Sequence, residues 1–285
     1  MALKGVLNLI RPFAMLRVWL IGLLLFIFVP IRAQESFHSP PRFQALGNAS
    51  VSLQSPHAVF SNPAGFSIHD KVSLGLSYES RFSLNDLQTA SAFGVFPLAG
   101  SWFGASFSQF GNQSYQENKW SVGISKQLSA RLRAGIQFHY LRIFLVENDE
   151  RPAYLLADLG LQYAFKNGVT VGAQLFNPKE LQFFKGNLTN SEPLLVRLGV
   201  HQTFGEAVLL AVELYQQEEK VTGVRAGIEL NLKRQFQCRV GIDSQLSLLT
   251  MGLGYSLKHL QFDIAFAHHR YLGYSPSFSV YYNWP

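Results

Sequence analysis

Charged side chains recur at alternate positions of strand-like segments from residue 133 onward, so they would share one face of a sheet. The cationic members are Arg133, Arg197, Arg225 and Arg239, and the acidic members are Asp158, Glu213, Glu229, Asp243 and Asp263. Such near-balanced charges favour ion pairs between neighbouring strands, which would fill a polar interior and make it rigid. The alternative is a hydrophilic pathway, although an ion-selective pore would more typically carry one sign of charge.

Residues suited to catalysis or metal binding do not show the spacing of known catalytic or metal-binding motifs. The eight histidines show no metal-ligand spacing, and the adjacent pair His268 and His269 would point to opposite faces of a strand. The single cysteine, Cys238, excludes a disulfide framework and a thiolate metal site. No Gly-x-Ser-x-Gly motif occurs, and no Ser, His and Asp are tied together by spacing. We therefore expect no enzymatic activity, no metal and no cofactor, with an enzyme as the least favoured alternative.

The first 33 residues have the layout of a secretory signal peptide. They carry Lys4, Arg11 and Arg17, then an apolar run over 18–29, and they end in Ala33. The apolar run is short for a membrane-spanning helix, which needs roughly 20 residues. These basic residues and Arg32 account for four of the six formal positive charges, so the exported chain would be near +2. No basic patch or stripe remains that would indicate nucleic-acid binding.

The exported chain has the composition of a membrane barrel. Aromatic residues make up 14% of the sequence and charged residues only 15%, against about 25% charged in ordinary soluble proteins. No second apolar run of helical span length occurs. Apolar and polar residues alternate instead, as in 260–266, which places one face on lipid and the other in a polar lumen. A soluble β-sandwich would also alternate, but it would not carry Arg, Asp, Glu or Gln on nearly every inner strand face.

A short motif of polar, apolar, Gly, apolar and polar residues repeats along these strands. It occurs at 133–137, 158–162, 170–174, 197–201, 225–229 and 239–243. The alternation places each Gly on the inner face, where it would make room among crowded side chains and ease strand bending.

About fourteen strands can be assigned, and short and long connections alternate between them. The expected strands cover 71–78, 88–96, 101–110, 119–127, 132–145, 154–165, 169–176, 194–203, 208–216, 223–232, 236–243, 246–256, 260–268 and 276–284. Outer-membrane barrels have short periplasmic turns and longer external loops. The sequence therefore predicts an all-β, transmembrane antiparallel barrel over 71–285, preceded by a plug-like segment over 34–70. It would lie in a bacterial outer membrane among its lipids, with both termini in the periplasm.

The segment before the first strand contains Asn62-Pro63-Ala64-Gly65, preceded by Ala45-Leu46-Gly47-Asn48-Ala49. This stretch resembles the start of FadL-type fatty-acid transporters and of their PorV/PorQ relatives in Bacteroidota, which serve the type IX secretion system. In the transporters the corresponding segment plugs the barrel. The resemblance implies that Asn62, Pro63, Ala64 and Gly65 form a plug or gate motif, although a plain turn before the first strand is the alternative.

The chain is shorter than the transporters, which favours the PorV/PorQ-like branch. Only 177–193, with Leu181, Phe183 and Phe184, is long and apolar enough to form an external binding loop. We therefore expect an accessory of protein secretion that binds secreted cargo or translocon proteins. The alternative is a FadL-like channel for a hydrophobic ligand such as a fatty acid.

Overall fold

The structure, a computed structural model, describes residues 38–67, 71–146, 151–178, 181–182, 193–217, 222–232 and 235–285. The expected signal peptide lies outside these residues. Within the described part of the chain, no helix is long and apolar enough to cross a membrane.

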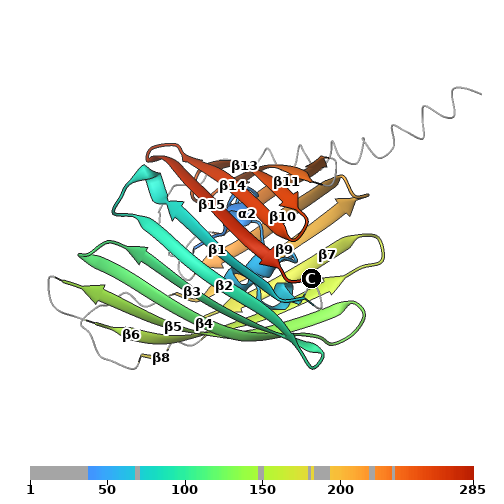
Figure 1. The fold of residues 1–285 in the computed structure, drawn as a ribbon, viewed down its shortest axis with the longest axis horizontal. Helices are drawn as coiled ribbons and strands as arrows, with labels where there is room; N and C mark the ends of the chain where they lie inside the picture. Colours follow the sequence, from blue (N-terminus) through green and yellow to red (C-terminus); the bar gives the residue numbers. More distant parts are fainter. Residues whose placement is uncertain are drawn as a thin grey trace, which may run out of the picture. The chain divides into compact units, whose positions relative to one another are not determined.

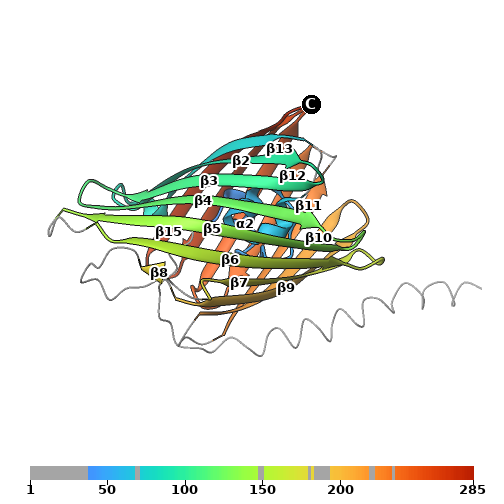
Figure 2. The same cartoon turned by 90° about the horizontal axis from the view of Figure 1, so that it is seen from below.

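Fourteen of the strands form one closed antiparallel barrel (Figures 1 and 2). Each pairs with the barrel strands next to it in sequence, and β1 (Ser73–Ser80) pairs with β15 (Gly273–Asn283) to close the ring. Between them lie β2 (Gln88–Leu98), β3 (Ser101–Gly111), β4 (Tyr115–Gln127), β5 (Leu132–Leu145), β6 (Ala153–Ala164), β7 (Val169–Phe176), β9 (Leu195–Phe204), β10 (Val208–Gln217), β11 (Gly223–Leu232), β12 (Phe236–Asp243), β13 (Leu248–Leu257) and β14 (Leu260–His269). The two-residue strand β8 (Leu181–Gln182) pairs only with β6, outside the ring. The predicted fourteen-strand barrel is confirmed.

The two faces of the wall differ as a membrane barrel requires. On β14, Phe262, Ile264 and Phe266 point outward and are exposed, whereas Asp263 and Ala265 point inward and are buried. The same alternation runs through the other barrel strands. An apolar face of this extent, continuous around a closed ring, is suited to lipid rather than to water.

The connections separate the barrel into two ends, which we call the turn end and the loop end. The turn end has the connections 99–100, 128–131, 165–168, 205–207, 233–235 and 258–259. The loop end has 81–87, which contains η3 (Arg81–Ser83), and then 112–114, 146–152, 177–194, 218–222, 244–247 and 270–272.

Two expected loops are much shorter than the sequence suggested. The expected loop over 111–118 is reduced to 112–114, and the one over 269–275 is reduced to 270–272. In the first, Asn112 Oδ1 accepts hydrogen bonds from the backbone N–H groups of Ser114 and Tyr115, at 2.8 and 3.0 Å. This side-chain turn lets β3 and β4 pair almost to their tips. The polar outward residues Gln116 and Asn118 therefore belong to a strand.

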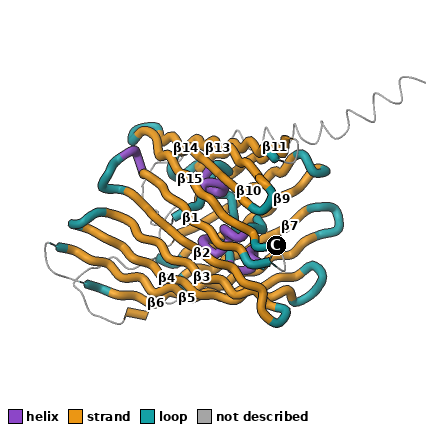
Figure 3. The backbone as a smooth tube through the Cα atoms, in the orientation of Figure 1, coloured by secondary structure: helices purple, strands orange, loops and turns teal. Residues whose placement is uncertain are grey.

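The lumen is occupied by residues 38–67, which we call the plug. It contains α2 (Pro41–Gln44), η1 (Pro56–Phe60) and η2 (Pro63–Phe66), the helices seen inside the strands in Figure 3. Its apolar core packs onto wall residues of β2 and β10. The core is formed by Phe43, Leu46, Ala49, Leu53, Ala58, Val59 and Phe66 of the plug and by Phe93, Val95, Leu209 and Ala211 of the wall. Each of the three helices begins with a proline. The missing N–H costs nothing there, because the N–H at the first position has no partner within the helix.

Outward aromatic side chains gather near the turn end. This turn-end girdle consists of Phe96, Phe103, Tyr163, Phe165, Phe204, Phe236, Tyr255, Tyr282 and Trp284. Several pack in pairs, such as Phe236 with Tyr255 and Tyr282 with Trp284, with ring centroids 4.7 and 5.6 Å apart. Aromatic girdles of this kind mark the level at which hydrocarbon gives way to lipid headgroups.

Candidate functional site

The turn at Asn62 joins the plug to the barrel wall. Asn62 is fully buried, and its Oδ1 accepts a 3.0 Å hydrogen bond from the backbone N–H of Ala64, which caps η2. Its Nδ2 lies 2.7 Å from the carbonyl oxygen of Val51 within the plug. The same nitrogen lies 3.3 and 3.2 Å from the carbonyl oxygens of Leu161 on β6 and Ala173 on β7. One buried side chain therefore both shapes the turn and ties it to two strands.

The remaining residues of the Asn-Pro-Ala-Gly motif also lie inside the lumen. Pro63, Ala64 and Gly65 are all buried. A Cβ on Gly65 would lie 2.6 Å from the carbonyl oxygen of Leu53, so only glycine fits there. The gate role that the resemblance implies stays a prediction.

Inward glycines on adjacent strands make room for the plug backbone. The strand register pairs Gly104 with Gly123, Gly135 with Gly160, Gly172 with Gly199, and Gly227 with Gly241, and we call these eight residues the glycine belt. At Gly135 a Cβ would lie 2.4 Å from the carbonyl carbon of Pro63, and at Gly172 it would lie 2.3 Å from the carbonyl oxygen of Val51. The repeated glycine motif thus accommodates plug main chain, rather than only the neighbouring wall side chains that the sequence suggested.

The belt is less tight at β3. A Cβ on Gly104 would meet only side-chain atoms of Phe66 and Val59, at 3.1 to 3.2 Å. Side chains can shift by a few tenths of an ångström, whereas plug backbone held by hydrogen bonds cannot. The plug is therefore fitted most closely against β5, β6, β7, β11 and β12.

Hydrogen bonds from the wall hold the plug around much of its circumference. Gln137, Gln162 and Gln174 donate from their Nε2 atoms to plug carbonyl oxygens, at 2.8 to 3.1 Å. On β13, Thr250 donates from Oγ1 to the carbonyl oxygen of Ala45 and accepts from the N–H of Gly47, both at 3.1 Å. These bonds satisfy buried N–H and C=O groups of the irregular plug backbone.

An ion-pair network lies on the inner faces of β9 to β14. Its members are Arg42, Arg197, Arg225, Arg239, Glu213, Glu229, Asp243 and Asp263. Arg225 joins Glu213 at 3.0 Å and Asp243 at 2.8 Å, and Arg239 joins Glu229 and Asp263 at 2.6 Å each. Four positive and four negative side chains balance, so the arrangement is a packed interior rather than a one-signed filter.

Two of the predicted network residues lie apart from it. Arg133 is near the turn end, and its Nε and Nη1 have no hydrogen-bond partner among the described residues. Asp158 on β6 accepts a 2.7 Å hydrogen bond from Gln174 Nε2 instead. In their place the plug supplies Arg42, which contacts Glu229 through Nε and Nη2 at 3.0 Å each. Arg42 was missed because it lies outside the strand pattern, and nothing in its spacing indicated a partner.

Glu213 accepts hydrogen bonds from both the wall and the plug. It accepts from Arg197 at 2.7 and 2.9 Å and from Arg225 at 3.0 Å. It also accepts from the backbone N–H groups of Ser50 and Val51 in the plug, at 2.9 Å each. Glu213 therefore links wall and plug, and its charge is matched by two arginines.

Ser121, His139 and Asp158 lie side by side on β4, β5 and β6. Ser121 Oγ is 2.8 Å from His139 Nδ1, but His139 Nε2 is 3.9 Å from Asp158 Oδ2. The second distance is too long for a hydrogen bond, so the three do not form the bonded chain that a serine hydrolase uses. No group of three or more His, Cys, Asp or Glu suited to a metal ion occurs in the described part of the chain.

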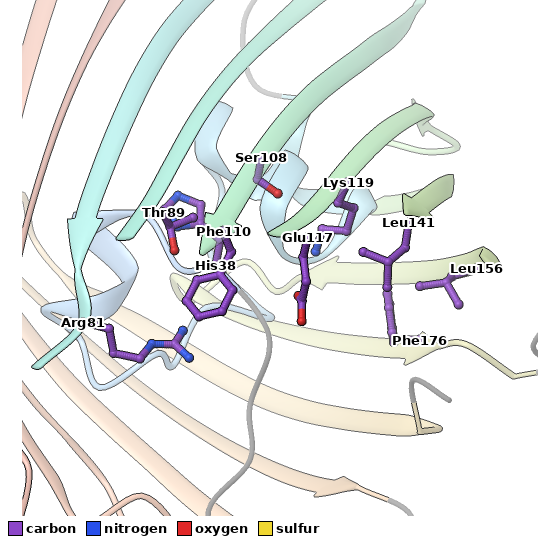
Figure 4. Close-up of a pocket in the computed structure, with 10 residues that line it drawn as sticks. All are labelled: His38, Arg81, Thr89, Ser108, Phe110, Glu117, Lys119, Leu141, Leu156 and Phe176. Carbon is purple, nitrogen blue, oxygen red and sulfur yellow. The ribbon is translucent and has the colours of Figure 1, made fainter. Parts of the chain in front are cut away.

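A cavity of about 50 Å³ lies in the lumen between the plug and the loop end (Figure 4). Leu141, Leu156 and Phe176 gather on one side of it, and Arg81 lies on the other. A second cavity of about the same size adjoins it and shares His38, Lys119 and Phe176. Benzene-binding cavities in proteins measure roughly 150 Å³, so each of these two cavities is too small for an aromatic ring.

Apolar side chains line the lumen beside this cavity. The set, which we call the loop-end cluster, consists of Leu141, Ile143, Tyr154, Leu156, Phe176, Leu195 and Tyr215, with Tyr115 and Leu145 packed against it. They come from β4, β5, β6, β7, β9 and β10. The inner wall is therefore polar and glycine-rich around the plug but apolar toward the loop end on β5 to β10, a change that the sequence-based prediction of a uniformly polar lumen missed. On β2 to β4 the cavity is lined by the polar side chains of Thr89, Ser108, Glu117 and Lys119.

The expected external binding loop is described only in part. Leu181 belongs to β8, where it pairs with Leu155 of β6. Phe183 and Phe184 lie outside the described residues. Binding by this loop stays a prediction.

His57, within the plug, makes barrel stability depend on pH. It is fully buried among the rings of Phe43, Phe93 and Tyr281, and neither ring nitrogen has a hydrogen-bond partner among the described residues. Burial lowers the pKa of His57 to about 3. The unfolded chain protonates this residue below pH 6.5 but the folded chain does not, so stability is full above pH 6.5 and falls as pH drops toward 3.

Between pH 7.5 and 5 this effect should cost about 2 kcal/mol of unfolding free energy, since one pKa unit corresponds to about 1.4 kcal/mol. Denaturant unfolding in detergent micelles measures it. The His57→Phe variant keeps the ring but cannot titrate, and it should lose correspondingly less stability over the same range. Equal losses in both proteins would contradict the assignment.

Comparison with known proteins supports the fold. No family model matches the sequence, and no curated protein matches it. The structure is similar to that of the toluene transporter TodX from Pseudomonas putida, with a TM-score of 0.66 and 13% identity over 90% of this chain and 99% of that chain. It is also similar to a Pseudomonas aeruginosa FadL homologue (TM-score 0.58, 11% identity, 90% and 99% covered). For the Ralstonia pickettii toluene transporter TbuX the TM-score is 0.59, with 12% identity over 86% and 97%.

These likenesses support the fold, a closed antiparallel β-barrel like those of the three proteins. At 11 to 13% identity they concern the fold alone. They lend no support to the PorV/PorQ branch or to a role in type IX secretion, which the sequence had favoured.

Proposed function

We propose that this protein is an outer-membrane channel for a hydrophobic small molecule, described here in a closed state. The observation that carries the proposal is the loop-end cluster, a set of apolar side chains that faces the lumen directly beside the cavity between plug and loop end. A lumen that served only for packing around ion pairs would have no need of an apolar entrance. The structurally similar TodX and TbuX, described as toluene transporters, are in keeping with this chemistry.

In this proposal the ligand enters at the loop end and the plug is the gate. The turn end, and with it the start of β1 and the end of β15, would face the periplasm; its short connections support this orientation. Passage requires the plug to shift, because the two cavities are smaller than a single aromatic ring needs.

Transport can be tested in vesicles that contain the purified barrel. Entry of a small aromatic hydrocarbon, followed with an enclosed fluorescent reporter, should be faster than in vesicles that contain a porin-type barrel of similar size. Equal entry rates in the two vesicle preparations would contradict the proposed channel function.

Replacing Asn62 with alanine should open the gate partly. The change removes the cap of η2 and the contacts to Val51, Leu161 and Ala173. Loss of buried hydrogen bonds of this kind costs about 1–3 kcal/mol, so we expect uptake to rise severalfold while the barrel stays folded. Asn118→Ala is the matched control, because Asn118 lies on the outer side of β4 and its side chain donates to Gln116 Oε1 of the same strand, away from the plug. An unchanged rate in Asn62→Ala would show that the turn is not a gate.

A second function, as an accessory of protein secretion, is favoured by one observation. The lumen is filled by the plug and is bonded to it on many strands, as suits a barrel that binds proteins at its rim rather than passing a ligand. Co-purification from detergent extracts separates the two functions. Secretion components bound to the barrel would support the accessory, and bound lipid or hydrocarbon would support the channel.

A further inference from the structure

Charges are distributed unequally between the two ends of the barrel. The six turns at the turn end contain Arg131, Lys166, Lys233, Arg234 and Lys258 but only one acid, Glu206. The seven connections at the loop end contain six cations and eight acids. The net charge of the connections is therefore +4 at the turn end and −2 at the loop end.

The cations at the turn end are spread around the ring. Arg131 follows β4, Lys166 follows β6 and Lys258 follows β13, so they do not form one compact patch. Lys126 adds a fourth described cation, exposed on the outer side of β4 two residues beyond the apolar Ile124. We call Lys126, Arg131, Lys166 and Lys258 the basic rim.

The basic rim lies directly beyond the turn-end girdle. The backbone N–H of Asn283 donates a 2.8 Å hydrogen bond to the carbonyl oxygen of His259, so the end of β15 lies beside the turn that carries Lys258. The ring of His259 packs on Tyr282, 5.9 Å between centroids, and Tyr282 packs on Trp284. Directly after β6, Phe165 of the girdle precedes Lys166. Cations therefore follow aromatic rings at the edge of the apolar wall.

From this arrangement we infer that the basic rim binds the phosphate headgroups of anionic lipids. Headgroups surround a membrane barrel as a ring at the level where the apolar wall ends, which is the geometry of these four side chains. Lysine and arginine can lay their alkyl stems along apolar surface and extend their charges into the headgroup layer. A nucleic acid or an acidic protein would bind more strongly to a compact basic patch, and the rim does not form one. The rim would select the lipids of one leaflet and hold the barrel at a defined depth.

Trp284 is a natural reporter for this binding, because it is exposed beside the Lys258 turn. In bilayers of mixed composition, lipids with brominated chains quench the fluorescence of tryptophans that they contact. We expect brominated phosphatidylglycerol to be enriched around Trp284 severalfold over brominated phosphatidylcholine. A cation near the membrane surface can raise the local preference for anionic lipid by up to about fivefold, the equivalent of ~1 kcal/mol. The preference should disappear in 1 M salt, where the Debye length is about 3 Å.

Matched variants locate the effect. The fourfold change Lys126→Gln, Arg131→Gln, Lys166→Gln and Lys258→Gln should bring the preference at Trp284 close to one. The loop-end control Arg142→Gln, Arg151→Gln and Arg270→Gln should leave it unchanged, since these exposed residues lie at the other end. Trp120 is the internal control, because it lies outside the turn-end girdle, packed on Tyr140. Subtracting the fluorescence of the Trp284→Phe variant from that of the unaltered protein isolates the contribution of Trp284.

The inference is overturned if Trp284 shows no preference for the anionic lipid in the unaltered protein. It is equally overturned if the preference survives the fourfold change. Because these experiments measure lipid contact and not uptake, they do not depend on whether the barrel is a channel.

Discussion

Replacing Glu213 with alanine should lower the unfolding free energy of the barrel by about 3–5 kcal/mol, the range found when one partner of a buried ion pair is removed. Glu213 is buried and accepts hydrogen bonds from two arginines, Arg197 and Arg225, and from two backbone N–H groups of the plug. Without the carboxylate, Arg197 keeps neutral partners such as Ser61 and Gln174, and Arg225 keeps Asp243, but one positive charge is no longer balanced. The loss is therefore electrostatic as well as a loss of hydrogen bonds.

Denaturant unfolding in micelles, followed by tryptophan fluorescence, measures this change. Glu206→Ala is the matched control, because Glu206 is exposed in a turn and lies outside the ion-pair network; surface changes of this kind stay within about 0.5 kcal/mol. Glu213→Gln should fall between the two, since it keeps an acceptor oxygen but loses the charge. If Glu213→Ala is as stable as the Glu206→Ala control, the network does not hold the barrel together.

The barrel itself was predictable because lipid imposes a strict rule on its outer face. Along β11 and β14, apolar residues occupy alternate positions. A one-residue slip in register would make Asp263 or Glu229 face the hydrocarbon of the membrane. The alternation therefore determines strand number, inner and outer faces and, with the turns, much of the register. The pairs Glu213 with Arg225 and Glu229 with Arg239 lie directly opposite each other in that register.

The parts that could not be predicted depend on contacts without sequence periodicity. Arg42 contacts Glu229 although 187 positions separate them, and only the folded plug brings them together. Leu141 and Ile143 face the lumen although the alternation was interpreted as polar inside. Near the loop end both faces of β5 carry apolar residues, so the two-residue period no longer distinguishes wall from lumen.

Because sequence alternation did not reveal the apolar lumen near the loop end, the favoured function also changed once the structure was known. The chain is shorter than the transporters, and only one expected external loop, 177–193, is long and apolar enough to bind a ligand, so the sequence favoured the secretion accessory. In the structure the apolar surface is built into strand ends, as the loop-end cluster, and needs no long loop. A compact barrel can therefore present a hydrophobic entrance within its wall.

Gly160→Ala should displace the plug, because a Cβ at this position would lie 1.9 Å from Asn62 Oδ1 and 2.9 Å from the backbone nitrogen of Ala64. Asn62 cannot turn away freely, since its Oδ1 caps η2 and its Nδ2 is bonded within the plug. Overpacking of a buried site costs about 1–3 kcal/mol, and the lost hydrogen bonds add about 1–3 kcal/mol more. We expect a clear loss of stability together with an uptake rate above that of Asn62→Ala.

Gly104→Ala separates plug fit from any general effect of an inward methyl group. Gly104 belongs to the same belt, but its Cβ would meet only the side chains of Phe66 and Val59, at 3.1 to 3.2 Å. It should therefore lose much less stability and leave uptake near the original rate. The double variant Asn62→Ala with Gly160→Ala completes a mutant cycle: once Oδ1 is gone, the second change should cost less than it does alone. Strict additivity of the two losses would mean that the glycine and the asparagine do not meet, and the plug would then lie elsewhere in the lumen.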